Sequence, residues 1–185
     1  CGPGDEVIIT APYWVSYSDL VKLTGATPVV IPTTEEAGFK LTPQQFLNSV
    51  TSRSRLLMIN SPSNPTGVVY ARNELEALAD AVLQTPVGVL SDEIYEQLTY
   101  GDAEPTCFAT LRPGLADRTI TISGVSKTYA MTGWRIGWSV APAPVSKFMA
   151  DLQSQETSNP CSVSQWAALE ALTGPQDSVA AMKIQ

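Results

Sequence analysis

The stretch TITISGVSKTYAMTGWRIGW (residues 119–138) decides what kind of fold this chain adopts. Its opening residues alternate threonine with isoleucine and end in Ser-Gly, which predicts a β-strand that stops at a turn. Lys127 follows that turn, and Arg135 lies eight positions further on among glycines and tryptophans. No acidic residue occurs between Arg118 and Ala150, although the whole chain has a formal net charge of −7. The stretch therefore joins a strand end to two cations that have no acidic neighbour in the sequence.

Short apolar runs alternate with segments of helical spacing along the rest of the chain. Thr42 followed by a proline is a typical helix start, and Gly25 is a typical helix stop. The predicted strands are 6–10, 27–32, 55–60, 86–93 and 119–124, and the predicted helices are 14–24, 43–52, 75–82 and 163–172. This alternation is typical of a mostly parallel sheet covered by helices on both faces. We predict an α/β fold in three layers, with its core in residues 1–150 and a helical segment in 151–185.

The composition excludes several classes of protein. The chain has no histidine, so it cannot by itself build a Ser-His-Asp or Cys-His catalytic unit or an HExxH zinc site. A pI near 4.5 argues against nucleic-acid binding, which needs a basic face. The three cysteines are far apart and form no CxxC pair, so we expect neither a disulfide framework nor a metal site.

The sequence also bears on location and completeness. No apolar run approaches the roughly 20 residues of a membrane helix, and the N-terminus does not resemble a signal peptide. We therefore expect a reducing, cytoplasmic setting and no membrane partner. The chain begins without methionine, in the middle of a turn-and-strand pattern, so we expect it to be a segment of a longer protein.

Polar or aromatic residues follow four of the predicted strands. Trp14 comes after the first, Asn64 after the third, Asp92 and Tyr95 after the fourth, and Lys127 after the fifth. Ligands of parallel sheets bind outside the carboxyl ends of the strands. We therefore expect these residues to gather along one sheet edge, although they are far apart in sequence.

Lys127 and Arg135 each have an ordinary interpretation and a functional one. A loop lysine is most often a solvated surface residue, but the bulky neighbours Tyr129 and Met131 favour partial burial. A partly buried lysine near another cation has a lowered pKa and can form a Schiff base. Arg135 lies in WRIGW, which alternates like a strand, as either a rim arginine or an anchor for phosphate. The absence of acidic neighbours favours the anchor.

The other candidates are equally open to two interpretations. Asp92 either caps the next helix or contacts a ligand, and Tyr95 lies on the same face if a helical turn begins there. Both side chains then address two atoms of one ring-shaped ligand. Asn64 precedes a proline, which favours an extended backbone, and is either a turn residue or a ligand contact. Trp14 is either a core residue or a plate on which a ring stacks.

Taken together, five segments resemble a known family. They are APYWVSY (11–17), INSPSNPTG (59–67), SDEIYE (91–96), GVSKTYAMTGWRIG (124–137) and SNPCSVSQWAALEAL (158–172). In this order and spacing they are similar to the class I, fold-type I aminotransferases that use pyridoxal 5'-phosphate (PLP), in particular to the bacterial-type aspartate aminotransferase subgroup. The resemblance implies an incomplete PLP-dependent transferase large domain, followed by a segment that leads toward a small domain outside the chain.

The resemblance implies a role for each candidate. Lys127 matches the catalytic lysine that forms a Schiff base with PLP and then moves a proton. Asp92 matches the aspartate that pairs with the pyridine nitrogen, and Arg135 matches the arginine that holds the phosphate. The family often has serine or threonine three positions before the lysine, where this chain has Gly124, so the source of a second phosphate contact is open.

Three further residues match cofactor contacts of the family. Tyr95 and Asn64 match the residues that hydrogen-bond the 3-oxygen of the ring. Trp14 matches the aromatic residue that stacks on the ring. Trp14 and Asn64 are also expected to face the substrate. The family's clamp for the substrate α-carboxylate and its partner-subunit tyrosine are not matched by any residue of this chain.

The implied function is transfer of an amino group between an amino acid and a 2-oxo acid, with aspartate and 2-oxoglutarate favoured, by a homodimer of the whole protein. Two alternatives remain open. One is the same chemistry on prephenate, an aromatic amino acid or alanine, and the other is a non-catalytic PLP-binding sensor domain of a transcription regulator. The segments PYWVSY and SQWAALEAL closely resemble aspartate aminotransferases, which favours the enzyme. The isolated segment is expected to be inactive.

Overall fold

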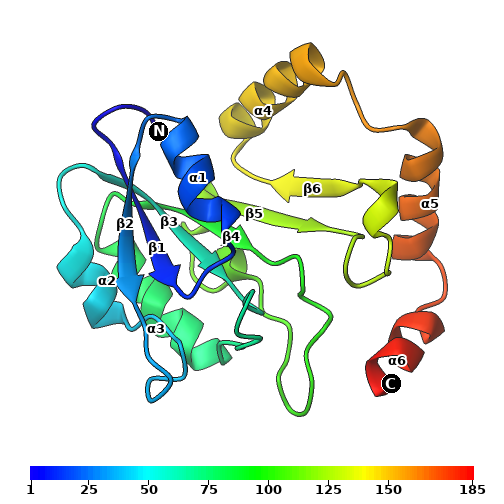
Figure 1. Ribbon diagram of the computed structural model, residues 1–185, viewed down its shortest axis with the longest axis horizontal. Helices are drawn as coiled ribbons and strands as arrows, with labels where there is room; N and C mark the ends of the chain where they lie inside the picture. The colour runs from blue at the N-terminus through cyan, green and yellow to red at the C-terminus, as the bar shows by residue number, and fades with distance from the viewer.

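One six-stranded sheet organises the chain, as the computed structural model of residues 1–185 shows (Figure 1). The strands are β1 (Glu6–Ala11), β2 (Thr27–Pro32), β3 (Ser54–Asn60), β4 (Gly88–Asp92), β5 (Thr119–Gly124) and β6 (Gly137–Val140). Their order across the sheet is β2-β1-β3-β4-β5-β6, and all neighbours run parallel except β6, which is antiparallel to β5. The predicted mostly parallel sheet is confirmed.

Helices cover both faces of this sheet. The helices are α1 (Ser16–Leu23), α2 (Pro43–Ser49), α3 (Arg72–Leu83), α4 (Ala143–Glu156), α5 (Ser162–Thr173) and α6 (Asp177–Ile184), with 3-10 turns at Phe108–Thr110, Ala116–Arg118 and Thr132–Trp134. Successive strand residues point to opposite faces. Ile8 accordingly packs in the core beneath α2 and α3, whereas Val7 and Ile9 pack with Tyr17 and Val21 of α1. The predicted three-layer arrangement is confirmed.

The start of α2 shows how the sequence sets a local boundary. The Thr42 hydroxyl accepts a hydrogen bond from the backbone N–H of Gln45, and the Gln45 side chain accepts one from the N–H of Thr42. This reciprocal capping box, with Pro43 at the first helical position, confirms the predicted start. The helix ends at Ser49, earlier than predicted, because the backbone of Val50 is already extended.

The C-terminal part of the chain is helical but little buried. Helices α4, α5 and α6 lie in an arc around β6, away from α2 and α3 (Figure 1). Phe148 and Leu152 of α4 and Trp166 of α5 are exposed. Helix α4 crosses residue 150, where the domain boundary is predicted, and that boundary stays a prediction. No helix is both long enough and apolar enough to cross a membrane.

The prediction that WRIGW is a strand throughout is wrong for Arg135. The 3-10 turn Thr132–Trp134 ends at Arg135, whose backbone has φ 57° and ψ 43° in the left-handed region. A hydrogen bond from its Nη1 to the carbonyl oxygen of Thr132 closes that turn at 2.9 Å. Strand β6 starts only at Gly137, so Arg135 precedes the sheet, and its side chain lines the cavity at the strand ends.

Candidate active site

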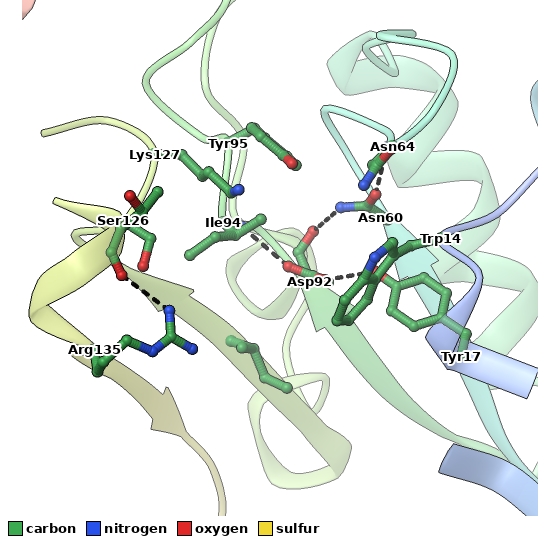
Figure 2. A pocket seen from close by; sticks show the side chains of 12 residues that line it. Trp14, Tyr17, Asn60, Asn64, Asp92, Ile94, Tyr95, Ser126, Lys127 and Arg135 are labelled. Carbon is green, nitrogen blue, oxygen red and sulfur yellow. Dashed lines mark hydrogen bonds between the residues drawn. The ribbon is translucent and has the colours of Figure 1, made fainter. Parts of the chain in front are cut away.

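A cavity of about 380 Å³ opens at the carboxyl ends of the parallel strands (Figure 2). All six residues singled out in the sequence line it: Trp14, Asn64, Asp92, Tyr95, Lys127 and Arg135. Arg135 and Ser126 lie on one side, Trp14 and Asn64 lie on the opposite side, and Asp92 lies between them (Figure 2). Residues separated by as much as 121 positions in sequence, from Trp14 to Arg135, therefore converge on one space because their strands are neighbours in the sheet.

Asp92 is held in place from three directions. Its Oδ1 accepts a hydrogen bond from the N–H of Ile94 at 3.2 Å, and its Oδ2 accepts one from the Tyr17 hydroxyl at 2.5 Å. Its carbonyl oxygen accepts a hydrogen bond from Nδ2 of Asn60 at 2.8 Å. Asp92 thus caps a turn, not a helix, while its carboxylate still lines the cavity. The capping and ligand-contact interpretations are compatible.

The adjacent carboxylate of Glu93 is buried in the core and does not line the cavity. Glu93 points to the other face of the sheet, where only 3% of it is exposed. Its Oε1 accepts hydrogen bonds from the Ser91 hydroxyl at 2.9 Å and from the N–H of Phe108 at 3.0 Å. Burial raises the pKa of the Glu93 carboxyl. The pair of carboxylates at the end of β4 therefore divides into one cavity residue and one structural residue.

Lys127 stands at the mouth of the cavity. Its Nζ lies 5.7 Å from the centre of the Tyr95 ring, within the range of a cation–π contact. It forms no ion pair. The expectation that Lys127 is partly buried is wrong, because the turn after β5 carries its side chain out over the open cavity. The carboxylate of Glu96 nevertheless reaches Ser123, so the run lacks acidic residues in sequence but not in space.

Trp14 offers a ring to the cavity. It is 44% exposed, which favours the plate interpretation over a core residue. Its ring meets that of Tyr17 edge to face, with the ring centres 5.6 Å apart and the planes at 87°. This contact braces the indole from behind and leaves the rest of it open to the cavity.

Asn60 and Tyr17 are among the cavity residues that were not singled out from the sequence. The Oδ1 of Asn60 accepts a hydrogen bond from the N–H of Asn64 at 2.7 Å, which joins the SPSNPTG loop to the end of β3. An asparagine that ends an apolar strand, as in RLLMIN, was the available signal for Asn60. No sequence signal connects Tyr17 with Asp92, because they are 75 positions apart and meet only across the sheet.

The position three residues before Lys127 is glycine for a steric reason. A Cβ atom on Gly124 would lie 2.9 Å from the carbonyl oxygen of Ile136 and 3.0 Å from the Cα of Gly137. The backbone of β6 thus occupies the space that a serine or threonine side chain would need. Ser123 does not substitute, because its hydroxyl donates to Glu96 at 3.2 Å. Ser126 lines the cavity together with Arg135 and Thr132, and its hydroxyl is one that an anion there could contact.

We expect Gly124→Ser to destabilise the whole protein by about 1–3 kcal/mol, because the new side chain overpacks the β5–β6 contact. Urea unfolding measures the change. Gly133→Ser is the matched control, because a Cβ atom there has no neighbour within 4 Å. Equal stability of the Gly124→Ser variant and the wild type would contradict the steric explanation.

Fold and cavity together define a class of protein: an α/β protein with a ligand site at its strand ends, built from an aspartate, a lysine without an ion-pair partner and an exposed arginine. Residues 1–185 match the family model described as aminotransferase class I and II. The chain belongs to this family.

Individual relatives agree with the family assignment. The chain is 54% identical over 179 residues to an aspartate/prephenate aminotransferase of Cereibacter sphaeroides, covering 96% of this chain and 45% of that protein. It is 50% identical over 180 residues to an aspartate aminotransferase of Geobacillus stearothermophilus, covering 97% and 46%. The crystal structure of the aspartate aminotransferase from Rhizobium meliloti matches with a TM-score of 0.96 at 45% identity, covering 99% of this chain and 46% of that one. The chain spans about half the length of these relatives.

Proposed function

We propose that the whole protein is a PLP-dependent aminotransferase that moves an amino group between an amino acid and a 2-oxo acid, with aspartate and 2-oxoglutarate the favoured pair. The observation that carries the proposal is the cavity that collects Asp92, Lys127 and Arg135 at one sheet edge. The names of the relatives, aspartate and aspartate/prephenate aminotransferases, support the substrate class.

The residues of the cavity fit PLP group by group. Arg135 and the Ser126 hydroxyl suit the phosphate, and the Asp92 carboxylate suits the pyridine nitrogen. The exposed indole of Trp14 suits the flat ring, and the amine of Lys127 suits an aldehyde. When bound, PLP supplies that aldehyde and a ring that accepts the electron pair left by the α-proton of the substrate.

Each residue then has a defined task. The Lys127 amine would hold the cofactor through its aldehyde, and when free it would be the base that moves a proton at the substrate α-carbon. Asp92 would place its carboxylate beside the ring nitrogen. Tyr95 and Asn64 line the cavity and would hydrogen-bond the ring 3-oxygen, and Trp14 and Asn64 would border the space for the substrate. Arg135 fixes the phosphate end.

The proposal extends to organisation. We include residues 1–150 as the core of the large domain and residues 151–185 as the segment that leads to a small domain. We also include a homodimer acting in the cytoplasm, in line with the family resemblance. The open alternatives are another substrate, such as prephenate, an aromatic amino acid or alanine, and a PLP-binding sensor domain without catalysis.

Spectroscopy and a turnover assay on the purified whole protein test the function. We expect the visible absorbance of bound PLP to shift when aspartate is added, and we expect glutamate to accumulate when 2-oxoglutarate is also present. Parallel reactions with prephenate, phenylalanine and alanine rank the substrates. A PLP spectrum without turnover on any of them would favour the sensor domain, and the absence of any PLP spectrum would refute the proposal.

We expect Arg135→Gln to weaken PLP binding by about 10–100-fold, since charged hydrogen bonds to the phosphate are lost. Binding of pyridoxal, which has no phosphate, should be unchanged. Titration of the apoprotein with each compound measures both dissociation constants. Arg55→Gln is the control, because Arg55 pairs with Asp5 at the opposite end of the sheet. An equal loss of pyridoxal binding would show that Arg135 does not act on the phosphate.

A further inference from the structure

Tyr17 reaches the cavity through a contact that nothing in the sequence indicates. It lies in the first turn of α1, and only 6% of it is exposed. Its hydroxyl donates to Oδ2 of Asp92 at 2.5 Å (Figure 2). Burial raises the pKa of this hydroxyl, and the charge of Asp92 raises it further. The hydroxyl therefore stays protonated at neutral pH and remains a donor.

The two oxygens of the Asp92 carboxylate are held by different parts of the fold. The N–H of Ile94, which holds Oδ1, belongs to the turn that Asp92 itself begins. The Tyr17 hydroxyl, which holds Oδ2, comes from a helix on one face of the sheet. One donor alone would leave the carboxylate free to rotate about its Cβ–Cγ bond, whereas two donors fix its plane. The orientation of the carboxylate thus depends on where α1 lies.

Tyr17 also supports the ring that borders the same cavity. Its backbone N–H donates to the carbonyl oxygen of Trp14 at 2.9 Å, and its ring meets the indole edge to face. A single buried side chain therefore contacts both the indole and the carboxylate. The hydroxyl proton of Tyr17 is directed at Asp92, so it is not available to donate to a ligand.

We propose that Tyr17 is a positioning residue that aims the Asp92 carboxylate at the ring nitrogen of the cofactor, an inference that rests on the proposed function. It donates one hydrogen bond, takes no part in bond making and acts only through Asp92. Its hydroxyl keeps the carboxylate in the orientation in which it stabilises positive charge on that nitrogen.

Tyr17→Phe in the whole protein tests the inference, because it removes the hydroxyl and keeps the ring packed against Trp14. We expect kcat to fall roughly tenfold, as for the loss of one charge-assisted hydrogen bond. The KM for the amino acid should stay within about twofold, since no substrate contact is lost. The absorbance spectrum of bound PLP should change, and its dissociation constant, measured on the apoprotein, should rise.

Tyr13→Phe is the matched control. Tyr13 lies in the loop just before α1, and its hydroxyl makes no hydrogen bond in the structure, so kcat, spectrum and PLP binding should match the wild type. A double-mutant cycle with Asp92→Asn separates positioning from general loss of structure. If Tyr17 acts through Asp92, Tyr17→Phe should have little further effect in the Asp92→Asn background.

Two outcomes overturn the inference. One is a Tyr17→Phe protein with wild-type kcat and PLP spectrum, and the other is fully additive losses in the double-mutant cycle. Failure of the proposed function is a distinct result, because the wild-type protein itself would then bind no PLP or transfer no amino group.

Discussion

Replacing Lys127 by alanine should lower the rate of transamination by the whole protein by about 10⁴-fold or more, the largest effect expected for any residue of the cavity. In the proposed function one amine has two tasks, since it would hold the cofactor covalently and would later move the proton at the substrate α-carbon. No other lysine lines the cavity, so nothing in the chain replaces it there. A spectrophotometric assay of aspartate and 2-oxoglutarate turnover measures the loss.

Chemical trapping shows whether the loss has the stated cause. After borohydride reduction of the wild-type protein, mass spectrometry should find a pyridoxyl group on the peptide that contains Lys127. The Lys127→Ala protein should carry none and should lack the wild-type absorbance of bound PLP. Lys147→Ala is the control, because Lys147 is an exposed lysine of α4 that pairs with Asp151. Retention of the wild-type absorbance in Lys127→Ala would rule out the covalent assignment.

The sheet and the meeting of its strand ends were predictable because they depend on patterns that extend over whole elements. Apolar runs such as VIIT and RLLMIN identify strands, and parallel strands carry their carboxyl ends to one edge. The order of the strands then determines which loops are neighbours. Asn64, Asp92 and Lys127 follow β3, β4 and β5, which lie side by side, so their convergence follows from the topology alone.

The parts that were not predicted depend on single contacts between distant segments. The left-handed backbone of Arg135 and the exposure of Lys127 are set by the turn between β5 and β6, where the chain approaches itself at Gly124. The link from Tyr17 to Asp92 joins a helix to a strand across the sheet. The periodicity of hydrophobic residues contains no information about such contacts. It indicates on which face of an element a residue lies, but not which distant residue it contacts.

Asp92 is the residue for which the second largest effect is expected. Asp92→Asn removes the negative charge beside the ring nitrogen and keeps an oxygen that can accept from Ile94. Without that charge the ring is a poorer acceptor of electrons, so transamination should fall by about 10²–10³-fold, the size found when a preorganised electrostatic contact is removed. Asp92→Ala should lose at least as much activity, because it also removes the cap of the turn.

Binding of PLP should respond far less than catalysis in both variants. Arg135, Trp14 and Lys127 contact other parts of the cofactor in the proposed arrangement, so the dissociation constant should change by less than about tenfold. Asp19→Asn, an exposed carboxylate of α1, is the matched control. Measured side by side, a large loss of kcat with modest loss of PLP affinity assigns Asp92 to the chemistry of the ring. Wild-type activity in Asp92→Ala would remove that role, and parallel losses of activity and binding would make Asp92 only an anchor.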